Sequence, residues 1–338
     1  MVVGIKDIAA YLGLSTSTVS RALNGYDDVA AETVKRVRQA ALQLGYYPSA
    51  AARNLRRRRT EMIGLALLFG SAYSTFNEFF AEVIRLVAAA AERRNYNLVL
   101  YTRSGDDPCR LARLAQTREV DGLLVLGDAP GIDAAIQSLQ ATGMPVIILG
   151  RAVENPEVGF ITPNILQAAR LALAHLVACG RQRIGYISFV KTSRYSQDRL
   201  AAYRTAMIEM GLTCDDDLVA YASLEPESGA QAIEALLARP DPPTAVYVYN
   251  DRLAIEVLQH LRRRQLHVPR DIAVIGFDDI RSARLTTPPL TTIRYPLAEI
   301  AEQAVGALLH HQAAGRTEPI RLILPVELIV RGSTVKDA

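Results

Sequence analysis

The sequence predicts an α/β protein that consists of a small all-helical head and a larger body in which parallel sheets form two lobes. Three observations carry this prediction. Apolar residues in the first 47 positions recur with helical spacing, whereas from Glu61 onward short Val-, Ile-, Leu- and Tyr-rich runs alternate with Ala- and Leu-rich helical stretches. At 338 residues, the chain also has room for about two domains of roughly 150 residues each.

The head is expected to contain three short helices. Each is indicated by a stripe of apolar residues at helical spacing, and Gly13 and Gly45 are expected to end the first and the third helix. The three stripes are Ile5, Ile8, Ala9 and Leu12; Val19, Ala22 and Leu23; and Val34, Val37, Ala41 and Leu44. Three helices in so short a segment form a compact bundle, which we assign to residues 1–47.

The second of these helices is expected to have one polar face. Helical spacing places Ser17, Ser20, Arg21 and Asn24 on the same side, opposite the apolar stripe. Small hydroxyl side chains let a helix lie close to phosphates and base edges, and arginine can bind guanine through two hydrogen bonds. With the tight turn at Gly13, this face is typical of a helix-turn-helix that reads duplex DNA. An ordinary three-helix bundle would satisfy the same pattern.

Positive charge is concentrated in the head. Residues 1–60 carry a formal net charge of +6, whereas the remaining 278 residues carry −3. A small basic head on a slightly acidic body indicates that only the head meets a polyanion such as nucleic acid. A solvated basic tail is the alternative explanation when the charge is considered alone.

Residues 48–60 are predicted to form a short hinge helix and a linker. Ser49 is a suitable N-cap and three alanines follow it, but a helix of about eight residues is shorter than the roughly 12–15 needed for stability in isolation. Two such helices from a dimer could pack through their alanines and insert Leu55 into a minor-groove base step. The arginines at 56–59 have a simpler alternative role as part of a solvated linker.

The body is expected to consist of parallel sheets covered on both faces, because its apolar runs are nearly continuous and are separated by helical stretches. The expected strands are Met62–Phe69, Asn97–Thr102, Gly122–Gly127, Pro145–Gly150, Val158–Thr162, Arg183–Ser188, Leu218–Ser223, Ala245–Asn250 and Ile272–Phe277. Two late runs, Leu290–Pro296 and Ile320–Arg331, are expected to cross back between the lobes, with a further hinge near Pro163. We therefore assign the body to residues 61–338, with one lobe at about 61–161 and 291–320 and the other at about 162–290 and 321–338.

Several function classes are disfavoured by features that the sequence lacks. No apolar stretch reaches the roughly 18 residues of a membrane span, and Lys6 and Asp7 interrupt the start before the apolar region of an export signal. Three isolated cysteines are expected to be free thiols, which favours a cytoplasmic protein. There is no phosphate-loop, nucleophile-elbow or dinucleotide motif, and the five histidines lack metal-ligand spacing. We therefore expect neither an enzyme nor an exported binding protein, and no cofactor or metal.

A ligand site is expected between the lobes. Ligands of open α/β sheets bind outside the carboxyl ends of the strands, which selects Arg151, Asn250, Asp251 and Asp278. A carboxylate or amide beside an arginine can bind neighbouring hydroxyl groups through paired hydrogen bonds, which suits a sugar. Asp251 and Asp278 have an alternative role as helix N-caps. Phe80 could cover an apolar ring face, but it is equally compatible with the core.

A series of motifs recurs in a fixed order along the chain. In the head these are IKDIA at 5–9, GLS at 13–15, STVSRALNG at 17–25, LGYYPSA at 44–50 and ARNLR at 52–56. In the body they are VDGLL at 120–124, EPESG at 225–229, RPDPPTAV at 239–246, ND at 250–251, VPRDI at 268–272, IGFDD at 275–279 and PPLTTI at 288–293. On these motifs the sequence resembles the LacI family (LacI/GalR type) of bacterial transcription regulators, over nearly its whole length.

The resemblance implies a helix-turn-helix head, a hinge helix and a two-lobed body like that of periplasmic sugar-binding proteins. It assigns base reading to Thr16, Ser17 and Arg21, and insertion into the minor groove to Leu55. The other implied DNA-binding residues, most of which contact the DNA backbone, are Ser20, Asn24, Thr33, Tyr46, Ser49 and Arg53. In the cleft the resemblance assigns effector binding to Arg199, which stands between Asp198 and Leu200, and gives weight to Phe80 as well.

The implied protein is a homodimeric repressor that binds a near-palindromic operator in double-stranded DNA, has no membrane partner and responds to a small ligand between its lobes. Gly150 and Pro163 depart from the family pattern, in which aspartate is common at both positions, and Leu224 stands where purine-responsive members have an aromatic residue. These departures favour a sugar or sugar derivative over the alternative ligand, a purine or nucleoside. A cytoplasmic enzyme or binding protein with the same body fold is the alternative from another class. Without a leucine-heptad tail after Arg331, dimers are expected rather than tetramers.

Overall fold

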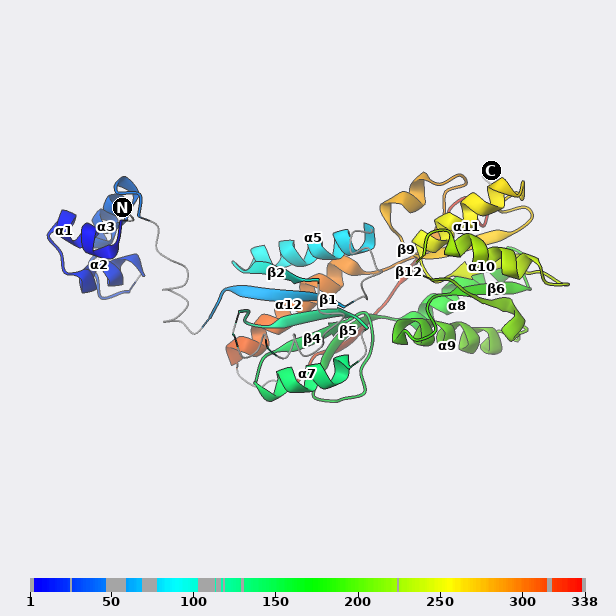
Figure 1. Cartoon of the computed structure of the whole chain (residues 1–338), viewed down its shortest axis with the longest axis horizontal. Helices are drawn as coiled ribbons and strands as arrows, with labels where there is room; N and C mark the ends of the chain where they lie inside the picture. The colour runs from blue at the N-terminus through cyan, green and yellow to red at the C-terminus, as the bar shows by residue number, and fades with distance from the viewer. Residues whose placement is uncertain are drawn as a thin grey trace. The chain divides into compact units, whose positions relative to one another are not determined.

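Figure 1 shows the computed structural model of the chain, which describes residues 3–24, 26–46, 59–68, 78–102, 113, 117, 119–128, 131–223, 225–314 and 318–335. The chain forms two compact units, a head (Met1–Glu61) and a body (Met62–Ala338). Most of the expected hinge helix falls outside the described residues, and so do Ser49, Arg53, Leu55 and Leu224. The predicted fold class, a helical head and an α/β body with two mostly parallel sheets, is confirmed.

The head contains the three predicted helices, which are α1 (Ile5–Leu12), α2 (Thr16–Leu23) and α3 (Ala31–Gln43). The turn between α1 and α2 is tight because Gly13 adopts a left-handed backbone with φ 66°. Ser15 then caps α2 by accepting a hydrogen bond from the Thr18 amide at 3.0 Å. The fully buried side chains that hold the three helices together are Ile8, Val19, Ala22 and Val37.

The first lobe of the body is built on a parallel six-stranded sheet with the order β11-β5-β4-β3-β1-β2. Its strands are β1 (Met62–Leu68), β2 (Asn97–Tyr101), β3 (Leu123–Gly127), β4 (Val146–Leu149), β5 (Gly159–Pro163) and β11 (Arg321–Leu324). Successive residues of a strand face opposite sides of a sheet. Leu65 and its neighbours on one face therefore pack against α5 (Glu78–Glu92) and α12 (Leu297–Ala314), whereas Ala66 faces α7 (Ile132–Ala141) (Figure 1).

The second lobe is built on a six-stranded sheet with the order β12-β10-β9-β8-β6-β7, in which β12 is antiparallel to β10. Its strands are β6 (Ile184–Ser188), β7 (Val219–Tyr221), β8 (Ala245–Val248), β9 (Ala273–Asp278), β10 (Thr291–Arg294) and β12 (Glu327–Ile329). The helices that cover its two faces are α8 (Ile165–Ala178) with α9 (Arg194–Glu209), and α10 (Ser228–Leu237) with α11 (Asp251–Arg263). Two short 3-10 turns, Asp216–Leu218 and Arg281–Leu285, complete the lobe.

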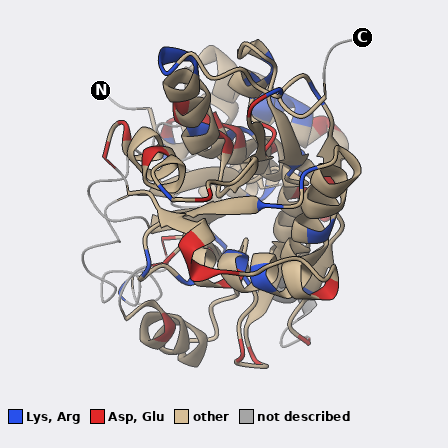
Figure 2. Ribbon diagram, turned by 90° about the vertical axis from the view of Figure 1, so that its right-hand side faces the viewer, with Lys and Arg blue, Asp and Glu red and all other residues tan. Residues whose placement is uncertain are grey.

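Lys, Arg, Asp and Glu residues lie mainly on helices and loops (Figure 2), and those within the described strands are Asp278, Arg294, Arg321 and Glu327. This distribution agrees with the continuous apolar runs of the sequence, since a strand covered on both faces has no side exposed to water. Among the helices that the structure describes, none is both long and apolar enough to cross a membrane.

The lobe boundaries differ from those expected from the sequence. Thr291–Arg294, expected in the first lobe, forms β10 and pairs with β9 of the second sheet. Arg321–Leu324, expected in the second lobe, forms β11 and pairs with β5 of the first sheet. The chain therefore passes between the lobes at the end of β5, after β10 and between β11 and β12. A short apolar run indicates a strand but not its partner, because the choice of sheet is made by tertiary packing.

A buried carboxylate fastens these crossing strands to the second sheet. Asp279 follows β9, and its side chain is only 3% exposed. It accepts hydrogen bonds from Arg294 of β10, at 2.9 Å, and from Arg331, which follows β12. Because a buried carboxylate needs charged or hydrogen-bonding partners, these two arginines are what allow Asp279 to lie inside the protein.

We expect Asp279→Ala to lower the free energy of unfolding of the body by about 3 kcal/mol, the lower end for a broken buried pair because Arg294 is partly exposed. Urea unfolding of the full chain, followed by circular dichroism, measures this loss. Asp216→Ala removes a carboxylate that pairs with Arg204 but is 88% exposed, so it should change stability by less than about 0.5 kcal/mol. Equal losses in the two variants would contradict an anchoring role for Asp279.

Candidate nucleic-acid interface and ligand cleft

The residues expected to read bases share an exposed surface of α2. Thr16 and Ser17 lie in its first turn and Arg21 lies one turn later, and all three side chains are exposed. The opposite side of the helix is buried through Val19 and Ala22. A helix whose outer face carries short hydroxyls and one arginine can approach phosphates and base edges closely.

The residues expected to contact the DNA backbone are spread over the head. Ser20 is buried, and Asn24 is half-buried at the end of α2, where its amide donates to the Ser20 carbonyl at 2.5 Å. Thr33 lies in the first turn of α3 and Tyr46 follows that helix, and both are half-buried. Ser20 and Asn24 thus help to end α2, whereas Thr33 and Tyr46 keep part of their side chains in solvent.

Arg21 has a carboxylate partner that the sequence analysis did not include. Its Nε donates to Asp28 at 3.2 Å, and its guanidinium lies 4.9 Å from the centre of the Tyr26 ring. The Arg21 and Asp28 side chains are 45% and 54% exposed, so this ion pair contributes no more than about 1 kcal/mol. A bidentate contact between arginine and guanine is worth about 1–3 kcal/mol of base discrimination, which makes it favourable for Arg21 to exchange Asp28 for a base.

Three buried side-chain atoms without a hydrogen-bond partner mark the region between the lobes. Among the described residues, the buried side-chain atoms without a partner are Arg151 Nε, Ser188 Oγ and Ser196 Oγ. Arg151 lies two residues after the end of β4, Ser188 is the last residue of β6, and Ser196 lies in the first turn of α9. A buried polar atom without a partner costs about 1–3 kcal/mol, so such atoms are expected where a ligand or water supplies the missing bond.

Arg151, which the strand-end rule selected as a ligand-binding residue, is buried. Its side chain is 3% exposed, and one terminal nitrogen donates to Asp133 at 3.0 Å while Nε stays unpaired. Asp133 itself is 64% exposed, so it neutralises the guanidinium from the solvent side. Arg151 therefore retains a buried donor with which to bind an oxygen atom of a ligand.

Arg199, selected by the resemblance, and Asp278, selected by the strand-end rule, lie close together in the second lobe. The Arg199 guanidinium lies 3.8 Å from the centre of the Phe277 ring and 4.5 Å from that of Tyr249, and one of its nitrogens is 4.0 Å from Asp278 Oδ1. Burial raises the pKa of the Asp278 carboxyl well above its usual range, and the nearby Arg199 charge opposes this only in part. A carboxyl and a guanidinium at this spacing can hold two neighbouring hydroxyl groups.

Asn250 and Asp251 have structural roles that the strand-end rule did not reveal. Asn250 caps α11, since its Oδ1 accepts a hydrogen bond from the Leu253 amide at 3.0 Å. Asp251 is fully buried and accepts hydrogen bonds from the Thr292 hydroxyl at 2.5 Å and the Ile280 amide at 2.9 Å. The N-cap anticipated at Asp251 is therefore Asn250. Asp251 instead joins α11 to β10, so its expected place in the effector site is not supported.

Burial of Asp251 makes stability depend on pH. It raises the pKa of this carboxyl to about 6, so the folded protein binds a proton that the unfolded chain releases near its ordinary pKa of about 3.9. The stability from this group is thus present below about pH 4 and lost as the pH rises through about 6.

Wild-type protein should therefore exceed Asp251→Asn in unfolding free energy by about 2–3 kcal/mol more at pH 4 than at pH 7.5. Urea unfolding of both proteins at the two pH values measures this difference. Glu302→Gln is the control of opposite sign: hydrogen bonds from Arg94 and Arg93 lower the pKa of Glu302 to about 2, so the advantage of the wild type over this variant should not grow at pH 4. A difference that does not change with pH would show that Asp251 does not titrate as its surroundings require.

Phe80 lies in the core and not at a cleft surface. It is 2% exposed and packs with β1, β3 and α12, so the expectation that it covers a ligand ring is not supported. The neighbouring residue Phe79 instead meets Tyr295 edge to face, with ring centres 5.3 Å apart. The periodicity of α5 decides which of the two phenylalanines is buried, and a shift of one position along a helix turns a side chain by about 100°.

Contacts between the lobes involve residues that the sequence analysis did not single out. Tyr195 of α9 reaches the carboxyl ends of β3 and β4, and the adjacent Arg194 amide donates to Asp128. Ser282 bonds to Glu78, at the first residue of α5, with its amide at 3.0 Å and with its hydroxyl. The sequence contains one signal for Tyr195. It stands four residues before Arg199, so the two side chains are expected on the same face of one helix.

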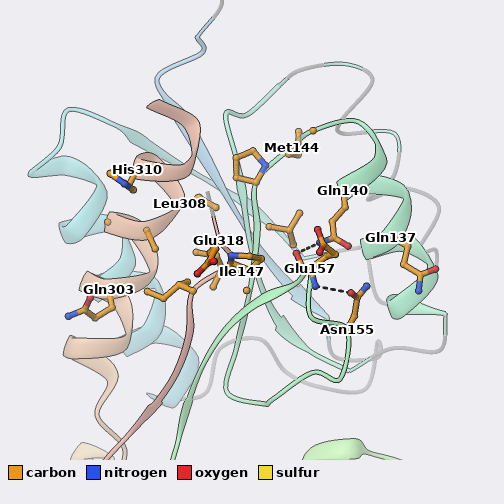
Figure 3. A pocket seen from close by; sticks show the side chains of 18 of the residues that line it. Gln137, Gln140, Met144, Ile147, Asn155, Glu157, Gln303, Leu308, His310 and Glu318 are labelled. Atoms are coloured by element: carbon orange, nitrogen blue, oxygen red, sulfur yellow. Dashed lines mark hydrogen bonds between the residues drawn. The ribbon is translucent and has the colours of Figure 1, made fainter. Parts of the chain in front are cut away.

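A separate groove lies on the first lobe alone (Figure 3). It has a volume of about 1140 Å³, with Gln137 and Gln140 of α7 on one side and Gln303 and His310 of α12 on the other (Figure 3). Its lining comes from the amino ends of β4 and β5 and contains none of the strand-end residues discussed above. The groove is therefore distinct from the expected ligand site between the lobes.

Known proteins resemble this chain in both of its parts. Residues 4–49 match the bacterial regulatory proteins of the lacI family, and residues 173–334 match a periplasmic binding protein-like domain. The ribose operon repressor of Escherichia coli (strain K12) is 35% identical over 332 residues, which cover 97% of this chain and 99% of the repressor. The regulator CelR of Thermobifida fusca is 32% identical over 97% of both chains.

Solved structures agree with these matches. The CelR–cellobiose complex has a TM-score of 0.74 at 30% identity, covering 98% of this chain and 99% of its own. The Lac repressor dimer bound to operator and the anti-inducer ONPF has a TM-score of 0.86 at 25% identity, covering 99% and 100%. Similarity extends over the head and the body together. The chain therefore belongs to the LacI family of bacterial regulatory proteins.

Proposed function

We propose that this protein is a cytoplasmic, homodimeric transcriptional repressor whose affinity for a near-palindromic operator is controlled by a sugar or sugar derivative bound between the two lobes. The observation that carries the proposal is the exposed face of α2, on which Arg21 and two short hydroxyl residues stand on a basic head. A regulator rather than an enzyme is also the function of the relatives, which include the ribose operon repressor and CelR.

A sugar is supported as the ligand by the polar groups between the lobes. Arg151, Arg199 and Asp278 supply donors and an acceptor, and the unpaired hydroxyls of Ser188 and Ser196 add two more groups that a polyol can satisfy. The half-buried Tyr249 ring lies beside the Arg199 guanidinium and can provide apolar surface for a sugar ring. The solved complex of the relative CelR contains cellobiose, which is chemistry of the same class.

Coupling between ligand and operator requires only that the ligand prefer one arrangement of the lobes. Such a preference is typically worth about 1–3 kcal/mol and acts reciprocally on both affinities. In the proposed mechanism two heads bind successive major grooves, and hinge segments from the two copies, with Ser49, Arg53 and Leu55, pack in the minor groove between them. A change in lobe closure alters the spacing of these segments, and with it the affinity for DNA.

Arg21→Ala should lower affinity for an operator selected from a random duplex library by about 1–3 kcal/mol and remove discrimination at one base position. Fluorescence anisotropy with the selected duplex and a scrambled one, at fixed salt, measures both effects. Arg38→Ala is the matched control, since Arg38 is exposed on α3 and its loss should weaken both duplexes equally. A wild-type protein with equal affinity for the two duplexes would contradict the proposed function.

Asp28→Asn tests Arg21 by removing its ion-pair partner, which should strengthen DNA binding. It releases Arg21 from its exposed ion pair, so binding of the selected duplex should tighten by up to about fivefold, which corresponds to less than about 1 kcal/mol. Weaker binding would mean that Asp28 orients Arg21 and does not compete with DNA for it.

Asp278→Ala should abolish the response to ligand and leave operator binding intact. The carboxyl lies in the body, far along the chain from the head, and its loss removes the acceptor beside Arg199. A thermal-shift screen of sugars with wild-type protein identifies the ligand, because a ligand that binds only the folded state raises the melting temperature. The same screen of the variant, with Asp241→Ala as a surface control, measures the loss. A variant that keeps the full shift would remove Asp278 from the site.

A further inference from the structure

Tyr195 of the second lobe forms two side-chain hydrogen bonds with the backbone of the first lobe. It lies in the first turn of α9 and is 9% exposed. Its hydroxyl accepts a hydrogen bond from the Gly127 amide at 3.2 Å and donates one to the Leu149 carbonyl at 2.8 Å. Gly127 and Leu149 are the last residues of β3 and β4, where the first sheet opens toward the cleft. One phenol therefore takes up both of these backbone groups.

Gly150 makes room for this arrangement. A Cβ atom at position 150 would lie 2.7 Å from the Tyr295 hydroxyl and 3.1 Å from a ring carbon of Tyr195. Contacts below 3.0 Å force atoms to move, and the left-handed φ of 81° at Gly150 also favours glycine. Any side chain at this position would push the two tyrosines away from the strand ends.

Tyr295 supports Tyr195 from the side of the crossing strands. It is 6% exposed and is held edge to face between Phe79 of the first lobe and Phe277 of the second, with ring centres 5.3 and 5.9 Å away. The two tyrosines thus fill the part of the cleft that borders the first sheet. The unpaired atoms of Arg151, Ser188 and Ser196 remain as hydrogen-bonding groups that no protein atom satisfies.

We propose that Tyr195, admitted by Gly150 and supported by Tyr295, is the residue that restricts the effector to a single sugar ring. This inference rests on the proposed function as a sugar-responsive regulator. The phenol takes the strand-end hydrogen bonds of the first lobe that a second sugar ring would need, and its ring occupies the adjoining space. A two-ring ligand would have to displace a buried tyrosine and break two hydrogen bonds, whereas a one-ring ligand is held by Arg151, Arg199 and Asp278 without doing so.

Isothermal calorimetry with the full-length protein tests the size limit, using D-ribose and the pairs D-glucose with cellobiose and D-galactose with lactose. Wild-type protein is expected to bind one of the single-ring sugars at least tenfold more tightly than any two-ring sugar. Tyr195→Ser should shift the one-ring to two-ring preference by at least tenfold toward the two-ring partner. Tyr203→Phe is the matched control, because it removes from the same helix a buried hydroxyl that donates to the Ile184 carbonyl at 2.8 Å, within the second lobe. Its preference should equal that of the wild type.

Hydrogen exchange of the Gly127 amide tests the underlying contact without any sugar. In wild-type protein this amide should be protected by the Tyr195 hydroxyl, and in Tyr195→Phe it should exchange at least tenfold faster, whereas Tyr203→Phe should leave it unchanged. NMR spectroscopy of deuterated protein provides the measurement. Tyr195→Phe keeps the ring and removes only the hydroxyl, so the variant is expected to remain folded.

The outcomes separate this inference from the function on which it rests. If Gly127 exchanges equally in the wild type and Tyr195→Phe, or if Tyr195→Ser keeps the wild-type sugar preference, the size limit set by Tyr195 is overturned while sugar sensing stands. A wild-type protein that prefers a two-ring sugar overturns it as well. If no sugar binds to any variant, the proposed function is overturned and the inference with it. Faster exchange together with the shifted preference supports both.

Discussion

The two adjacent carboxylates at the end of β9 are the constraint on which the second lobe depends. Asp279 is buried and accepts hydrogen bonds from Arg294 and Arg331. It therefore holds β10, after which the chain passes to the first lobe, and the segment that follows β12. Asp278, the residue before it, is buried near Arg199 and faces the cleft residues of the same lobe. Both residues have a positive φ, which turns the chain sharply and directs neighbouring side chains to different partners. The same turn therefore places one carboxyl group where the chain passes between the lobes and the other beside Arg199.

Several contacts between the lobes are polar, beside the apolar stacking of Tyr295 between Phe79 and Phe277. The Tyr195 hydroxyl, the Arg194 amide with Asp128, and Ser282 with Glu78 join the lobes through hydrogen bonds that water can replace. Each such bond contributes only about 0.5–1.5 kcal/mol net, which is the size of change that a bound ligand can supply. Arg21 follows the same principle in the head, because its exposed pair with Asp28 is weak enough to be exchanged for a base.

Much of the architecture was predictable from local patterns. The stripes of the head and the continuous apolar runs of the body correspond to helices and strands, and the run predicted at Arg183–Ser188 forms a strand at Ile184–Ser188. Arg151 and Asp278 were selected because ligands bind at strand carboxyl ends, and Arg199 because of its motif, and their roles in ligand binding stay predictions. The contacts that bury Asp251 and Phe80 were not predictable, because sequence position does not tell which neighbour a side chain contacts. Tyr195 was missed because it bonds to backbone groups of β3 and β4. Every residue has such groups, so the sequence does not indicate which of them a side chain contacts.

The sequence by itself determined the helical head, the reading face of α2, the alternation of strands with helices and the family to which the chain belongs. These features depend on residues that are near one another in the chain, through periodicity, capping and motif spacing. Tertiary structure alone decided that β10 joins the second sheet and β11 the first, that Asp251 is a buried link between α11 and β10, and that two tyrosines fill the space beside Gly150. The reason is physical: strand pairing, burial of charge and steric contact are set by groups that are distant in sequence and meet only after folding.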